Sequence, residues 1–228
     1  MTSSSQPDLT EFLAFSAHDI KNSLAMLTGM LEKVLATHDE RDFDGYKDLA
    51  TMLYETRRIN NDLMQMLTLF KLDRKLYPFD VQPVVMADFL SDMTAQNAQL
   101  FKSQGIELTS DTADDLVWHF DEDLLQGTIN LALNNASRYC KKHIHISALK
   151  RDGMLEIRVE DDGAGYPAAM LDNSQQALGV DFSNGSTGLG MYFARNVASL
   201  HKNKGRSGGL LLENGGSLGG SAFIIQIP

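Results

Sequence analysis

The sequence predicts an α+β fold in which an antiparallel helical hairpin precedes an α/β sandwich. Two observations support this prediction. Apolar residues up to about residue 72 recur at alternating steps of three and four, which is typical of long amphipathic helices. After Pro78 the pattern changes to short strands separated by shorter helical stretches. Because proline disfavours helix at the preceding Tyr77, we expect two domains, at residues 1–75 and 76–228.

Composition limits the classes of partner and the compartment. The chain has 228 residues and a formal net charge of −10, so we expect no nucleic-acid partner, because a duplex is a dense line of negative charge. The single cysteine, Cys140, excludes a disulfide framework and a cysteine-rich zinc site, and it fits a reducing compartment. No apolar run approaches the ~20 residues that span a bilayer, and the polar start lacks a signal-peptide pattern. We therefore expect a cytoplasmic protein without a membrane span, whose input comes from a separate sensory partner.

In the first domain, the sequence predicts two long helices joined by a polar connection at residues 37–42. The first helix should run from residue 7 or 8 to about 36, and the second from about 44 to 72. Their apolar seams are Leu13, Ala17, Ile20, Leu24, Leu27, Leu31 and Val34, and Leu49, Met52, Thr56, Ile59, Leu63, Met66 and Phe70. One hairpin cannot cover both seams well, so we expect a homodimer that forms a four-helix bundle. The alternative is a hairpin that packs only against its own chain.

In the second domain, the sequence predicts helices packed on one face of a mostly antiparallel sheet. Asp121 can cap its second helix, and Asp152–Gly153 is a strong signal for a hairpin turn. The expected helices cover residues 86–103, 121–139 and 188–201, and the expected strands cover 79–84, 106–109, 117–120, 143–150, 154–160, 209–213 and 222–227.

His18 and Asn22 lie one helical turn apart on the flank of the first predicted helix. His18 follows the seam position Ala17, so its imidazole can face solvent. With Asp19 beside it and a carboxamide one turn away, this is a usable site for phosphoryl chemistry. A single histidine on a helix flank is more often only a surface residue, and these residues alone leave both interpretations open.

The helix that ends near Tyr139 offers the first candidate segment for nucleotide binding. A carboxamide of Asn134 or Asn135 can ligate magnesium, which takes only one or two protein ligands beside substrate phosphates. Arg138 can meet a phosphate, and Tyr139 can lie against a base or a ribose. Asparagines near a helix end are also common caps, which is the alternative here.

Two glycine-containing segments are further candidates. Residues 161–165 directly follow a predicted strand, where the glycines let the backbone approach a ligand and Asp161 can accept a hydrogen bond from the adenine amine. A plain strand-to-loop turn is the alternative. Residues 186–191 open a helix, whose free amides can bind a polyphosphate. The stretch between these segments has few apolar anchors, which is typical of a mobile lid.

In this order and spacing, the segments resemble the core of the two-component sensor histidine kinases. That core is a dimerisation and histidine-phosphotransfer domain followed by a GHKL-type ATP-binding domain, and the resemblance covers residues 9–228. The phosphoacceptor box matches residues 18–22, the asparagine box resembles 135–139, and the two glycine boxes match 161–165 and 187–191. The segment from Gly219 to Phe223 resembles the usual closing strand.

The resemblance implies a protein histidine kinase that uses ATP and Mg²⁺. His18 would be the phosphorylated imidazole, and Asp19 would be its general base or hydrogen-bond partner. Asn22 would help to position water when the same domain dephosphorylates a response regulator. The homodimer would hand the phosphoryl group from His18 to an aspartate of the regulator's receiver domain.

The resemblance also implies roles in the nucleotide site. Asn135 would ligate the magnesium ion, Arg138 would contact a phosphate, and Tyr139 would form a wall of the site. Asp161 would recognise the adenine amine. The remaining nucleotide-binding residues would be Gly163, Gly165, Thr187, Gly188, Leu189 and Gly190.

The chain departs from the family pattern at several positions. Ser23 stands where many members have a proline, so the first helix lacks that cause of a kink. Leu131 replaces the first asparagine of the usual pair, and Asn130, one residue earlier, would point elsewhere. Ser186 replaces a glycine, and Phe182 is the only candidate for the phenylalanine box. Leu131 and Ser186 favour an alternative, a histidine phosphotransfer or phosphatase module with a degenerate ATP domain, whereas the intact segment 161–165 speaks against it. A GHKL serine kinase or ATPase is a third interpretation.

Overall fold

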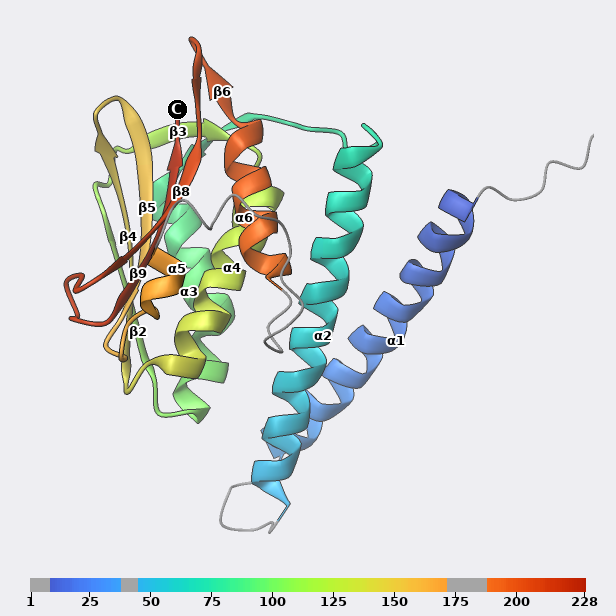
Figure 1. Cartoon of the computed structure of the whole chain (residues 1–228). Helices are drawn as coiled ribbons and strands as arrows, with labels where there is room; N and C mark the ends of the chain where they lie inside the picture. Colours follow the sequence, from blue (N-terminus) through green and yellow to red (C-terminus); the bar gives the residue numbers. More distant parts are fainter. Residues whose placement is uncertain (1–8, 38–44, 172–187) are drawn as a thin grey trace, which may run out of the picture. The chain divides into compact units, whose positions relative to one another are not determined.

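The structure of the chain is a computed structural model that describes residues 9–37, 45–171 and 188–228 (Figure 1). For residues 9–15, 17 and 18 it describes the backbone alone. The chain divides into two compact units, residues 1–77 and residues 78–228.

The first unit is a pair of antiparallel helices, α1 (Leu9–Thr37) and α2 (Tyr46–Asp73) (Figure 1). Both predicted helices are therefore confirmed to within about two residues at each end. α1 runs through Ser23 without interruption, and the Ser23 hydroxyl donates to the carbonyl of Asp19 at 3.0 Å. The two helices are linked by an ion pair between Arg57 Nη2 and Glu32 Oε1 at 2.5 Å.

α2 ends in a hydrogen-bonded cap that separates the hairpin from the rest of the chain. The N–H of Leu76 donates to the carbonyl of Lys71 at 2.8 Å, and the N–H of Lys75 donates to that of Leu72 at 3.1 Å. These are the two hydrogen bonds of a Schellman motif. Lys75 occupies its left-handed position with a φ of 57°, where glycine is the usual residue.

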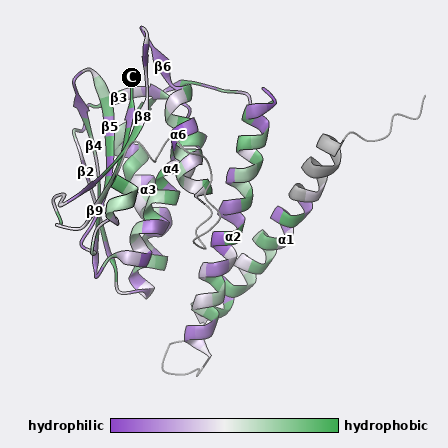
Figure 2. Ribbon diagram, viewed as in Figure 1, coloured by the Kyte–Doolittle hydropathy of each residue, from purple (hydrophilic) through white to green (hydrophobic). Residues whose placement is uncertain are grey.

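The apolar seam of the hairpin is largely open to solvent. Apolar residues recur along both helices (Figure 2). Seam residues at steps of seven on each helix are between 38% and 56% exposed; they are Ile20, Leu27 and Val34 on α1, and Met52, Ile59 and Met66 on α2. Packing of α1 against α2 therefore leaves an apolar stripe on each helix without full cover.

The second unit is built on a five-stranded sheet with the strand order β2-β4-β5-β9-β8. β2 pairs with β4 in parallel and the other pairs are antiparallel. The strands of this sheet are β2 (Glu107–Thr112), β4 (His143–Arg151), β5 (Met154–Asp161), β9 (Ser221–Ile227) and β8 (Gly209–Asn214). A separate antiparallel pair is formed by β1 (Gln82–Val85) and β3 (Val117–Phe120).

Three helices cover one face of the five-stranded sheet (Figure 1). They are α3 (Met86–Ser103), α4 (Glu122–Tyr139) and α6 (Leu189–Leu200). The predicted α+β sandwich is thus confirmed, and Asp152 and Gly153 both have positive φ, as the predicted hairpin turn requires. Three short elements were not predicted, because two to four residues are too few to show a period; they are α5 (Ala168–Leu171), β6 (Lys202–Asn203) and β7 (Arg206–Ser207).

The core of the second unit lies between these helices and the sheet. Ile157 on β5 faces Ala148 on β4 and Ile225 on β9, and all three side chains are buried. On the opposite face of β5, Arg158 Nη1 donates to Glu156 at 3.0 Å and Nη2 donates to Glu160 at 3.3 Å. β5 therefore alternates between an apolar core face and a paired charged face, as a strand with period two should.

None of the helices in the described parts of the chain is both long enough and apolar enough to cross a lipid bilayer.

Candidate functional site

The start of α4 is fixed by a cap within the helix and by hydrogen bonds to two other segments. Asp121 caps the helix as predicted, because its Oδ1 accepts from the N–H of Leu124 at 3.1 Å and its Oδ2 accepts from that of Asp80 at 3.0 Å. Nε2 of the buried His201 accepts the N–H of Asp121 at 3.0 Å. His201 Nδ1 lies 2.8 Å from the carbonyl of Val197 and must donate to it, so the imidazole is neutral. α4 is thereby held in a fixed position relative to the end of α6.

Asn135 lies in the last turn but one of α4 and has an available carboxamide. The residue is half-buried, and within the described part of the chain its side chain has no hydrogen-bond partner. By contrast, Asn130 Oδ1 accepts a hydrogen bond from Asn97 of α3 at 3.2 Å. The prediction that Asn130 points elsewhere is therefore confirmed. The carboxamide oxygen of Asn135 is a type of ligand that a magnesium ion takes.

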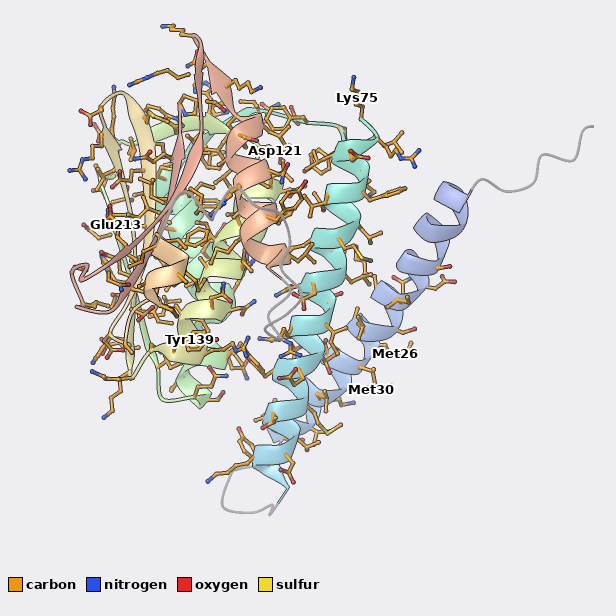
Figure 3. The ribbon with its side chains drawn as sticks, viewed as in Figure 1. Met26, Met30, Lys75, Asp121, Tyr139 and Glu213 are labelled. Carbon is orange, nitrogen blue, oxygen red and sulfur yellow. The ribbon has the colours of Figure 1, made fainter. Side chains whose placement is uncertain are left out.

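Arg138 and Tyr139 form the exposed end of α4. The Arg138 guanidinium carbon lies 5.7 Å from the centroid of the Tyr139 ring. Tyr139 is 66% exposed and projects from the end of the helix (Figure 3). The guanidinium of such an arginine can contact a phosphate, and the exposed aromatic ring beside it can lie against a base or a ribose.

Asp161 ends β5 and its carboxylate is buried within the loop that follows. Its Oδ1 accepts the N–H of Gly163 at 2.7 Å and that of Ser221 at 3.3 Å. Its Oδ2 accepts a short hydrogen bond from the hydroxyl of Ser221. The carboxylate is thus held in one orientation by donors from β9 as well as from its own loop.

The loop after Asp161 touches the end of α4. A Cβ at Gly163 would collide with the carbonyl oxygen of Tyr139, so only glycine allows this approach. Asp162 strengthens the junction, because its Oδ1 accepts the N–H of Lys141 at 2.7 Å and that of Lys142 at 3.1 Å. The structure therefore brings the asparagine segment and the first glycine segment together. Gly165, with a φ of 82°, continues this loop.

The start of α6 lies against the middle of α4. Gly188 caps the helix with a φ of 60°, and Leu189 is its first residue. A Cβ at Gly190 would lie 2.5 Å from Leu131 Cδ1, so the missing side chain of Gly190 makes room for Leu131. The predicted helix start is thus confirmed, its role in binding an anion stays a prediction, and Leu131 packs beside it as an apolar, buried residue.

Several predicted features lie elsewhere. His18 lies in α1, with its side chain outside the described residues, and Asp19 and Asn22 are exposed on the same helix. These three residues belong to the first unit, and all the described nucleotide candidates belong to the second. The predicted lid, with Thr187, Phe182 and Ser186, lies outside the described residues.

Two residues of the site were not found by sequence reasoning. Ser221, which bonds to Asp161, was read only as part of a closing strand, although a hydroxyl directly after two glycines was visible. Tyr166 follows Gly165 in the loop after Asp161, and its N–H donates to Asn214 Oδ1 on β8 at 2.7 Å. Burial, together with the charge of Asp161, raises the pKa of Tyr166 to about 12. Nothing in the spacing of Tyr166 distinguished it from an ordinary loop aromatic.

Comparison with known proteins identifies the type of the second unit. The family described as histidine kinase-, DNA gyrase B- and HSP90-like ATPases matches residues 120–228. The sensor histidine kinase RppB of Synechocystis is 26% identical over 96% of this chain and 48% of its own length. The sensor protein SrrB of Staphylococcus aureus is 23% identical over 96% of this chain and 38% of its own length. The chain thus spans half or less of the length of these relatives.

Solved structures share the fold. The full-length ShkA structure in complex with AMPPNP matches 96% of this chain and 45% of its own, with a TM-score of 0.63 and 18% identity. The catalytic domain of histidine kinase ThkA matches 65% of this chain and 97% of its own, with a TM-score of 0.54 and 18% identity. The first match includes the helical hairpin as well as the sandwich.

Proposed function

The chain belongs to the sensor histidine kinases and has their catalytic ATPase domain, and on that premise we propose that it autophosphorylates His18 with ATP. The observation that best supports this proposal is the convergence of three segments in the second unit. The segments that contain Asn135, Asp161 and Gly188 meet where Gly163 approaches the carbonyl of Tyr139 and where Gly190 approaches Leu131. We assign residues 76–228 to the catalytic domain and residues 1–75 to the phosphoacceptor domain.

Each segment contributes one kind of interaction with ATP. The N-terminus of α6 offers amide groups to the phosphates, and Arg138 adds a positive charge. Asp161 accepts a hydrogen bond from the adenine amine, and Tyr139 lies against the base or ribose. A Mg²⁺ ion, with Asn135 as its protein ligand, would neutralise charge on the phosphates. Positioning and charge neutralisation of this kind supply most of the catalysis in phosphoryl transfer.

His18 is the nucleophile in this proposal. One imidazole nitrogen attacks the γ-phosphorus of ATP, the bond from that phosphorus to the bridging oxygen breaks, and ADP leaves. Asp19, the next residue of α1, orients the imidazole and accepts its proton. Asn22, one turn further along, positions water when a regulator is dephosphorylated.

The open seam of the hairpin supports a homodimer. Six seam residues at steps of seven are at least 38% exposed although the hairpin is folded. A second copy of the hairpin would cover them and complete a four-helix bundle.

The partner for phosphotransfer is the receiver domain of a response regulator. Met26 and Met30, one and two turns beyond Asn22, are 63% and 57% exposed and project from α1 (Figure 3). Exposed methionines form adaptable apolar contacts, so this face of α1 suits a protein partner beside the phosphoacceptor. We assign the reaction to the cytoplasm, where ATP and a separate sensory partner supply its inputs.

The test is incubation of the purified chain with γ-labelled ATP and magnesium. Wild type should gain a label that is labile in acid and stable in alkali, as expected of phosphohistidine. His18→Ala should gain none, and the matched control His119→Ala, at an exposed histidine of β3, should be labelled like wild type. Equal labelling of His18→Ala and wild type would overturn the assignment.

One observation favours a second function. Leu131 packs against Gly190 where the family has an asparagine, so the middle of the nucleotide site has an apolar side chain instead of a carboxamide. A phosphotransfer or phosphatase module with a degenerate ATP domain would tolerate this change. Such a module would bind no ATP, but His18 would take label from a phosphorylated receiver domain.

A further inference from the structure

Asp162 ties the end of β5 to the residues directly after α4. Its Oδ1 accepts the N–H of Lys141 at 2.7 Å and that of Lys142 at 3.1 Å, and its Oδ2 accepts the same Lys142 N–H at 3.2 Å. The N–H of Asp162 itself donates to the carbonyl of His143 at 3.3 Å. Both the side chain and the backbone of this one residue therefore hold the chain where it leaves α4.

Asp162 lies between two residues that meet other parts of the candidate site. The carboxylate of the preceding Asp161 is bonded to Ser221 on β9. The backbone of the following Gly163 approaches Tyr139 so closely that a Cβ there would lie 2.3 Å from the Tyr139 carbonyl oxygen. This short turn therefore fixes the distance between the Asp161 carboxylate and the last residue of α4.

The helix dipole does not favour the carboxylate of Asp162 at this place. The C-terminus of a helix carries a partial negative charge, so an anion directly beyond it is unfavourable. Burial acts to raise the pKa of Asp162, but the bonded backbone N–H groups, that of Lys142 above all, outweigh it and hold this pKa below its ordinary value. The carboxylate thus stays charged near neutral pH. What its hydrogen bonds provide is a fixed position for the helix end that carries Arg138 and Tyr139.

We propose that Asp162 is a positioning residue for ATP, which holds the Arg138 guanidinium and the Tyr139 ring at a fixed distance from the Asp161 carboxylate. This proposal rests on the proposed function and deepens it by naming the residue that fixes two parts of the nucleotide site relative to each other. Tyr139 is 66% exposed, so packing alone does not hold its ring. A helix end that moved relative to β5 could not meet the phosphates while Asp161 holds the adenine amine.

The experiment measures the binding of ATP to the full chain in the presence of Mg²⁺. Asp162→Ala should weaken ATP about ten- to a hundredfold, because a contact with the base or ribose and a contact with a phosphate are loosened together. Asp162→Asn keeps one oxygen that can accept from Lys141 and Lys142, so its loss should be smaller. The matched control Asp114→Ala removes an exposed carboxylate from the loop between β2 and β3 and should leave the affinity unchanged.

A double-mutant cycle separates a positioning role from a merely structural one. In a chain that already carries Arg138→Ala and Tyr139→Ala, the side chains that Asp162 positions are gone, so Asp162→Ala should weaken ATP by less than about twofold. A general contribution to the stability of the sandwich would instead lower the affinity by the same factor in both backgrounds. Equal losses in the two backgrounds, or no loss in either, would show that the inference is wrong.

The outcomes also separate this inference from the proposed function. If wild type binds ATP and the chain with Arg138→Ala and Tyr139→Ala binds it as tightly, these side chains do not contact the nucleotide. The inference is then wrong, although the chain remains a nucleotide-binding protein. If wild type binds no ATP, the proposed function itself is wrong and the inference fails with it. Should Asp162→Ala fold poorly, Asp162→Asn is taken through the same cycle, and its smaller loss should again disappear in the second background.

Discussion

The two units of this chain differ in how completely their apolar residues are buried. In the sandwich, alternate residues of the central strands are almost completely buried, as Ile157 and Ile225 show. In the hairpin, seam residues such as Leu27 and Ile59 remain half exposed. The difference is one of packing partners and not of composition, because both units have regularly spaced apolar residues (Figure 2).

This comparison indicates which unit is complete alone. Burying apolar surface contributes roughly 25 cal/mol per Å², and the sandwich obtains that contribution from its own three helices and sheet. A two-helix hairpin has no third layer, so half of each seam stays in water. The sandwich should therefore keep its fold and ligand binding whether or not the hairpin dimerises. The hairpin should need a second copy of itself to bury its seam.

The largest effect is expected from a charge in the seam. Met52→Glu would place one carboxylate from each copy in an apolar interface, where an unpaired charge costs several kcal/mol. The dissociation constant of the dimer should rise by about a hundredfold or more. Sedimentation or light scattering over a range of concentrations measures it.

The matched control for this variant is the neighbouring Thr51→Glu, which puts the same charge on an exposed position off the seam. It should leave the dimer intact. Nucleotide binding by the sandwich should be unchanged in both variants. A Met52→Glu chain that stays dimeric would show that the open seam is not the interface.

A smaller effect is expected from the tight contact between α4 and α6. Gly190→Ala would place a methyl group against Leu131 and should lower the free energy of unfolding by about 1–3 kcal/mol. Leu131→Ala opens that space, so the double variant should lose less than the two single variants together. Denaturation followed by the fluorescence of Trp118, the only tryptophan, reports on the sandwich alone. Additive losses would mean that the two residues do not share a closed contact.

The sequence could predict most of the fold because the signals were long and regular. The period of the two hairpin helices and the Asp152–Gly153 turn placed their elements to within a few residues. The sequence also identified the segments around Asn135 and Asp161, since glycine and asparagine signals are local. Local signals could not show what those segments touch.

The contacts that complete the site join residues far apart in the chain. Ser221 bonds to Asp161 across 60 positions, and Gly190 fits against Leu131 from another helix. Sequence reasoning interpreted Gly190 as a glycine for the nucleotide, and the structure adds that the missing side chain also makes room for Leu131. Long-range packing of this kind has no periodic signature, which is why the structure was needed to reveal it.

The smallest effect is expected from acid, and it should fall on the sandwich. His201 is buried at the end of α6 with both ring nitrogens bonded, and the ring of Phe79 lies edge-on to it at 5.0 Å. Burial lowers the pKa of His201, although the carbonyl of Val197 and the charge of Asp121 act in the opposite direction. A proton on Nε2 would face the N–H of Asp121 and break that hydrogen bond.

The sign of the pH dependence follows from this lowered pKa. Above about pH 6.5 the imidazole is neutral in both the folded and the unfolded chain, so the stability is fully present. Below that pH the unfolded chain takes up a proton that the folded sandwich does not, and the free energy of unfolding should fall. His201→Gln should flatten this fall between pH 7 and 5 as followed by Trp118 fluorescence, whereas His119→Gln, at an exposed position, should retain it. An unchanged slope in His201→Gln would mean that some other group causes the acid sensitivity of the sandwich.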